Sequence, residues 1–200
     1  MTSDEAHAAL GTLEAELRAR DPRVAVVTEE TVERDGQTLT QYRIPAPNGT
    51  LPPGIDSPTL VWYTPIGERS GSSAAVDGIL EALRTCMDLI PGLMTHGQIA
   101  IEPMVAYIAV KPGRKVRAWV SGLVQPLLIH DRDRLIHDLG AVAVPEIRRM
   151  IVIGIVFPRD GQRVNAFDLP MPADWMAARA QAGAKPLVFP EELFAIVWPD

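Results

Sequence analysis

One segment, residues 72–90, restricts the fold more than any other part of the chain. Ser72 or Ser73 can cap a helix and Pro91-Gly92 can end one, so SSAAVDGILEALRTCMDLI is predicted to be helical. Its apolar side chains cover most of the circumference, and its charged side chains share one narrow stripe. Those charged residues are Asp77, Glu81, Arg84 and Asp88. A helix that is apolar nearly all round is buried on more than one side. We therefore expect a curved sheet or a partner subunit to enclose it.

Most of the remaining chain predicts strands in hairpin order. Residues 23–34 and 37–44 are rich in β-branched side chains and are joined by Asp35-Gly36, a strong signal for a tight hairpin turn. The other predicted strands are residues 59–67, 98–110, 115–129 and one or two within 141–167. Further helices are predicted at residues 3–20, 130–140 and 175–181. This order favours an α+β fold, with a largely antiparallel sheet packed around the apolar helix, over alternating β and α units.

A proline-rich segment, residues 45–58, suggests the domain organisation. Its prolines remove backbone donors and fix φ, so it is predicted to be an exposed loop. Residues 1–44 then form an N-terminal helix plus β-hairpin, which is too small to fold alone and is expected to dock on the body. Residues 59–200 form the main α+β domain.

The middle of the chain resembles the hot-dog fold, in which an antiparallel sheet wraps one long helix. The resembling elements are a strand at 59–64, the apolar helix 72–90, and strands 98–110 and 115–128 joined by VKPGRKV. The resemblance implies a protein that dimerises edge to edge and acts on an acyl thioester. Because no catalytic motif of that family is matched here, no catalytic residue is assigned from it.

Composition narrows the classes of function. The formal net charge is −6 and the basic residues form no dense patch, which makes a nucleic-acid partner unlikely. A single cysteine excludes an intramolecular disulfide and a zinc site built on several thiolates. The first residues, MTSDEAHAAL, do not resemble a signal peptide, and no apolar stretch is long enough to span a bilayer. We therefore expect a soluble, cytoplasmic protein with no membrane partner and no cofactor.

The stretch HDRDRLIHD, residues 130–138, contains two His-Asp pairs and raises the question of a metal site. On a helix, His130, Asp133 and His137 share one face, but the two histidines are roughly 10 Å apart along the axis. That separation is too large for one ion with ligands at about 2.1 Å. We therefore predict no metal and interpret the stretch as the solvated face of an amphipathic helix. The expected surface pairs are Arg134–Asp138 and Asp133–His137.

Several other residues are weak candidates for chemistry. Arg69, Ser70 and Ser72 lie between a strand and a helix N-terminus, where backbone N–H groups can hold an anion or a substrate. Glu102 is a lone carboxylate in an apolar strand, and burial would raise its pKa. Asp88 and His137 are the remaining catalytic candidates.

These candidates do not converge on one reaction. We expect a soluble oligomeric binding or assembly protein without its own catalytic centre, whose partner is a second copy or another protein. One alternative is a small-molecule enzyme of hot-dog type that acts on an acyl thioester. A weaker alternative is a metal-assisted hydrolase that uses His137 with Asp133. Whether the protein is an enzyme stays open.

Overall fold

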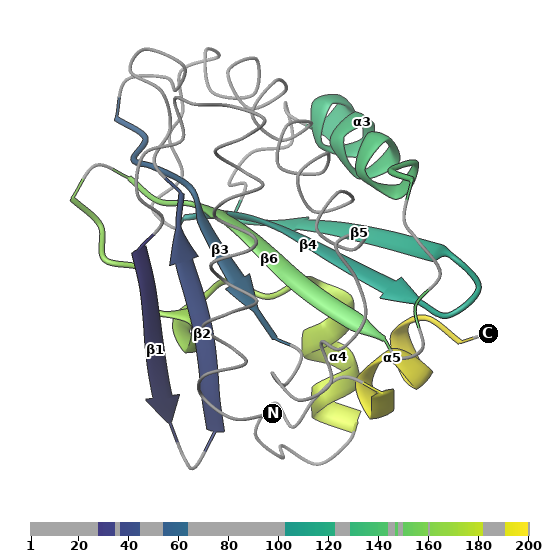
Figure 1. Ribbon diagram of the computed structural model, residues 1–200. Coiled ribbons are helices and arrows are strands. Elements are labelled where there is room, and N and C mark those ends of the chain that lie inside the picture. Colours follow the sequence, from purple (N-terminus) through teal and green to yellow (C-terminus); the bar gives the residue numbers. More distant parts are fainter. Residues whose placement is uncertain are drawn as a thin grey trace.

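In the computed structural model of the protein, six strands of the described residues form one sheet (Figure 1). They are β1 (Thr28–Arg34), β2 (Gln37–Arg43), β3 (Thr59–Trp62), β4 (Met104–Lys111), β5 (Lys115–Ser121) and β6 (Ile151–Phe157). Their order in the sheet is β1-β2-β3-β6-β4-β5, and every neighbouring pair is antiparallel. The structure describes residues 28–34, 37–44, 54–63, 103–122, 129–143, 147, 150–159, 161–181 and 191–199. Within these ranges, the predicted α+β class with a largely antiparallel sheet is confirmed.

The first hairpin lies where the sequence predicts it. Arg34 of β1 faces Gln37 of β2, so the chain reverses between these two residues. β2 continues into the sheet by pairing with β3, which places the hairpin in the same sheet as the later strands. The helix expected at residues 3–20 lies outside the described residues, so the division into a docked N-terminal piece and a main domain stays a prediction.

The end of the proline-rich segment differs from the exposed loop that the sequence predicts. Ile55 is buried and forms an isolated β-bridge with Arg159, and the Asp56 amide donates to the carbonyl of Pro158 at 2.9 Å. The physical reason is that Ile55 contributes an apolar side chain to the core. Residues 45–53 lie outside the described residues.

The second hairpin, β4–β5, turns at Pro112-Gly113-Arg114 between the facing residues Lys111 and Lys115. Gly113 has φ of +82° and Arg114 has φ of 59°, the left-handed conformations that let so short a turn close. The predicted turn is therefore confirmed. The strand predicted to run to residue 129 is too long, because β5 ends at Ser121 and Ile129 begins a helix.

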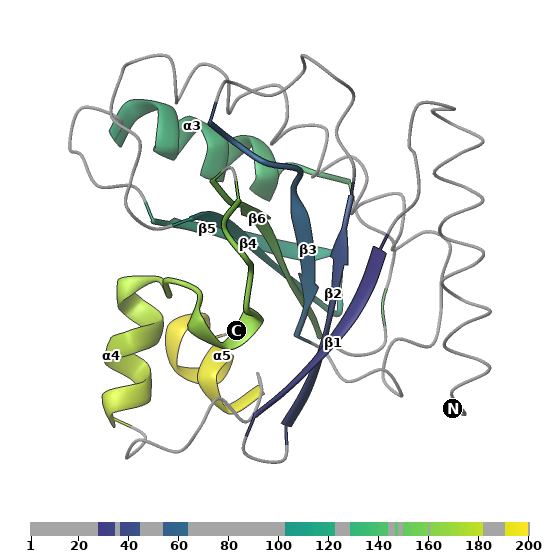
Figure 2. The same cartoon turned by 90° about the vertical axis from the view of Figure 1, so that its left-hand side faces the viewer.

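Helices cover the two faces of the sheet (Figures 1 and 2). They are α3 (Ile129–Gly140) on one face, and η3 (Ala166–Asp168), α4 (Ala173–Gln181) and α5 (Glu191–Val197) on the other. The predicted helices at 130–140 and 175–181 are confirmed as α3 and α4. Among the described helices, none is long and apolar enough to cross a membrane. The apolar helix 72–90 lies outside the described residues, so its hot-dog-like wrapping stays a prediction.

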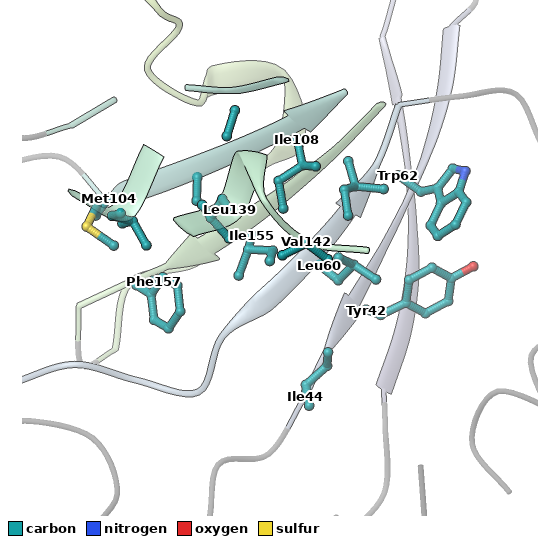
Figure 3. Close-up of a cluster of buried hydrophobic side chains, with 14 of the residues drawn as sticks. Tyr42, Ile44, Leu60, Trp62, Met104, Ile108, Leu139, Val142, Ile155 and Phe157 are labelled. Carbon is teal, nitrogen blue, oxygen red and sulfur yellow. The ribbon is translucent and has the colours of Figure 1, made fainter. Parts of the chain in front are cut away.

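The core consists of two layers, because side chains alternate between the faces of each strand. On the α3 side, Leu135 and Leu139 are fully buried against the sheet. Figure 3 shows Leu139 close to Ile155 of β6 in this layer. Amphipathic spacing in α3 thus directs its leucines inward and its charged residues outward.

The other layer is dominated by aromatic side chains from the sheet, α4 and α5. The ring of Trp175 lies 4.7 Å from that of Tyr107, 5.3 Å from that of Trp119 and 5.2 Å from that of Phe194. The Tyr107 hydroxyl donates to the carbonyl of Pro170 at 3.0 Å, and burial raises the pKa of Tyr107 above its ordinary value. This tyrosine is thus held neutral as a packing element.

Two cations fix the end of α5 to the β4–β5 hairpin. Lys111 Nζ donates to the carbonyl of Trp198 at 2.5 Å, and Arg117 Nη1 donates to the carbonyl of Val197 at 2.7 Å. The last carbonyls of a helix have no partner within the helix and carry partial negative charge, so basic side chains stabilise them. The C-terminal apolar segment is therefore a helix that docks on the sheet.

Candidate functional site: a groove along strand β5

A groove of about 760 Å³ follows β5, the edge strand of the described sheet. Residues 116–121 of β5 line it from end to end. One wall is the exposed side of α3, and the other is the start of α4 with the residue before it. The wall residues are Arg132, Ile136, His137 and Gly140 from α3, Ala141 directly after it, and then Pro172, Ala173 and Asp174. The edge of the sheet is therefore recessed between two helical layers.

The α3 wall follows from the amphipathic pattern of that helix. Leu135 and Leu139 point into the core, which leaves the neighbouring ridge of Arg132, Ile136 and Gly140 beside β5. At Gly140 a Cβ atom would meet no other atom within 4 Å. The groove is therefore open at this position.

The opposite wall is tied to the floor by a hydrogen bond between side chains. Trp119 Nε1 donates to Asp174 Oδ2 at 2.8 Å, which joins β5 to the first turn of α4. The next residue, Trp175, is buried in the aromatic layer and anchors α4 below the groove. The position of this wall thus depends on contacts between segments far apart in the sequence.

Cationic side chains stand on both sides of the groove. Arg117 places its guanidinium 5.0 Å from the ring centroid of Trp119 and 4.0 Å from Asp174. Arg132 contacts Asp133 at 3.0 Å, and the Arg132 side chain is 42% exposed. With His137, which is exposed, the groove presents two guanidinium groups and an imidazole against the single carboxylate of Asp174.

The backbone of an edge strand is itself a binding group. In an antiparallel strand, every second residue directs its N–H and C=O groups away from the neighbouring strand. Among the described strands, β5 pairs only with β4. The outward groups of β5 therefore face the groove, where an extended chain can pair with them.

Of the predicted site residues, His137 is the one that falls within the described ranges, and it lines this groove on the α3 wall. The predicted pair of Arg134 with Asp138 is confirmed at 3.6 Å. The predicted pair of Asp133 with His137 is wrong, because Asp133 contacts the guanidinium of Arg132 instead.

The other sequence candidates remain untested. Arg69, Ser70, Ser72, Asp88 and Glu102 lie outside the described residues, so the anion site and the catalytic carboxylates stay predictions. Within the part of the chain that is described, no group of three or more histidine, cysteine, aspartate or glutamate side chains could hold a metal ion.

Sequence reasoning missed the groove itself, including the roles of Arg117, Trp119 and Asp174. One signal was present: Lys115 and Arg117 alternate with apolar residues in KVRAWVS, a pattern typical of edge strands. No local sequence pattern predicts the contact between β5 and the start of α4, because the two segments are far apart in the sequence. Comparisons of the chain with protein families, with curated proteins and with solved structures found no match.

Proposed function

We propose that the protein is a binding or assembly protein and that it binds through the β5 groove. The observation that carries this proposal is the recessed edge strand, whose backbone lines a groove between α3 and α4. Strand addition to an exposed sheet edge is a recurrent way to bind an extended segment, because backbone hydrogen bonds give affinity while flanking side chains give specificity.

The charged residues of the groove support binding better than catalysis. Asp174 accepts the hydrogen bond of Trp119, and Arg117 donates to the end of α5, so both help to hold the walls in place. General acid–base chemistry needs a titratable side chain that can exchange a proton with the reacting atom. The carboxylate of Asp174 is instead engaged by Trp119 and by Arg117, and Arg132 stands on the opposite wall.

Site-specific photo-crosslinking in the native cell tests this function. Gly140→p-benzoylphenylalanine places the probe in the groove, at a position where a side chain begins in open space. The matched control is Ala177→p-benzoylphenylalanine, at an exposed position of α4 that does not line the groove. We expect position 140 to give a discrete product, absent from position 177, that mass spectrometry maps to one extended segment.

A crosslinked segment from a second copy and one from another protein would both support a binding role. The proposal is contradicted if position 140 gives no product beyond those of position 177, while both variants fold and accumulate normally.

A further inference from the structure

We infer that the β5 groove takes an extended acidic segment, which adds a further strand beside β5 and carries carboxylates at alternate positions. This inference rests on the proposed function and specifies the chemistry of the partner. It depends on three features: the recessed edge, the hydrogen-bond donors of the α3 wall (the guanidinium of Arg132 and the imidazole of His137), and the spacing of those donors.

The recessed edge favours a single strand over the edge of a second folded body. α3 and the start of α4 flank β5 on opposite faces of the sheet, and both line the groove (Figure 2). A second copy that approached with its own β5 would bring its own flanking helices against these walls. A bare extended segment needs only the spacing of one strand, about 4.8 Å from β5.

The α3 wall selects for negative charge. Arg132 and His137 line it together with the apolar Ile136. Arg132 contacts Asp133 at 3.0 Å, but the Arg132 side chain is 42% exposed, so its guanidinium can also reach a ligand carboxylate. The formal charge of the whole chain is −6, so attraction of an acidic ligand has to come from these local groups.

The spacing of the guanidinium of Arg132 and the imidazole of His137 matches a strand. Arg132 and His137 are five residues apart on α3, which is roughly 7.5 Å along the axis. Alternate residues of an extended strand are about 6.8 Å apart and point to the same face. Figures 1 and 2 both show α3 running along β5, so carboxylates at positions i and i+2 of an added strand can face both groups.

The α4 wall favours a different kind of ligand side chain from the α3 wall. Pro172 and Ala173 present small apolar surfaces, and the carboxylate of Asp174 is already matched by the guanidinium of Arg117, 4.0 Å away. The residues of the added strand that face this wall should therefore be small and uncharged. The occupant is thus an extended segment in which acidic residues alternate with small ones.

Fluorescence anisotropy with synthetic peptides and the full chain tests the inference. The probe is a short peptide that alternates glutamate with alanine or threonine, and its control carries lysine in place of every glutamate. We expect the acidic peptide to bind at least about tenfold more tightly, equivalent to about 1.4 kcal/mol, and its binding to weaken as salt is added. Equal affinity for the two peptides would overturn the inference.

Backbone methylation tests strand pairing without changing the protein. Two forms of the acidic peptide are methylated at the amides of even or of odd positions. Because only alternate amides can donate to β5, one form should lose binding and the other should keep it. Loss in neither form would show that the peptide does not add as a strand.

Reversing the charge of Arg132 tests whether the α3 wall determines the preference for an acidic peptide. Arg132→Glu should reverse the preference toward the lysine peptide, whereas Arg134→Glu, an equal change of charge at a residue that does not line the groove, should preserve it. Equal effects of the two variants would contradict a specific role for the α3 wall.

The peptide and crosslinking experiments can fail separately. If position 140 crosslinks a defined segment while the acidic preference is missing, the acidic ligand is wrong and the binding groove stands. If position 140 crosslinks nothing and no peptide binds, both proposals fall.

Discussion

Leu139→Ala is expected to lower the free energy of unfolding by about 2–5 kcal/mol. Leu139 is fully buried between α3 and the sheet, in one layer with Leu135 and Ile155. Removing its methyl groups forfeits their burial and leaves a cavity that rigid neighbours fill only in part. The same change loosens the attachment of the groove wall, so peptide binding should weaken as well. Urea denaturation followed by circular dichroism measures the stability.

Arg134→Ala provides the matched control on the same helix. Its side chain is 64% exposed and pairs with Asp138 at 3.6 Å, and exposed pairs at this spacing contribute only about 0.3–0.5 kcal/mol. If Leu139→Ala cost no more than Arg134→Ala, α3 would not be packed on the sheet as described.

Gly122→Ala is expected to destabilise the fold by more than about 2 kcal/mol. Gly122 follows β5 with φ of +85°, and an added Cβ atom would lie 2.2 Å from the carbonyl oxygen of Pro103. Both effects act on the backbone, so no side-chain rotation relieves them. The strand pair that ends at Val105 and Ser121 should therefore shift or fray. The melting temperature should drop accordingly.

Gly161→Ala separates the cost of the positive φ from the cost of the close approach to Pro103. Gly161 has a similar φ of +74°, but a Cβ atom there meets nothing within 4 Å. This variant should show only the conformational cost, about 1–2 kcal/mol. Equal losses for Gly122→Ala and Gly161→Ala would mean that the close approach to Pro103 contributes nothing.

The elements that the sequence predicted well are those with local signals. Asp35-Gly36 and Pro112-Gly113 mark their hairpins by turn chemistry, and the spacing of Leu135 and Leu139 marks α3. Each of these signals depends on residues within a few positions of one another, where backbone preference and amphipathic spacing act directly.

The features that escaped prediction depend on distant contacts. β6 lies between β3 and β4 in the sheet. A prediction that pairs each strand with the next one along the chain does not give this order. The groove exists because Asp174 meets Trp119, residues far apart in sequence that carry no mark of their pairing. The end of β5 was misplaced because the sequence of residues 122–129 is apolar enough to continue a strand, while Gly122 has a φ of +85°, which is not the conformation of a strand.

Hydrogen exchange at the amides of β5 is the measurement that tests the binding groove most directly. It is made by NMR on the full chain, with and without a saturating amount of the acidic peptide. If the peptide adds as a strand, alternate amides between Val116 and Ser121 gain protection, while the amides of β1, at the far edge of the described sheet, stay unchanged. A bound peptide that leaves the exchange of every β5 amide unchanged would contradict strand addition in this groove.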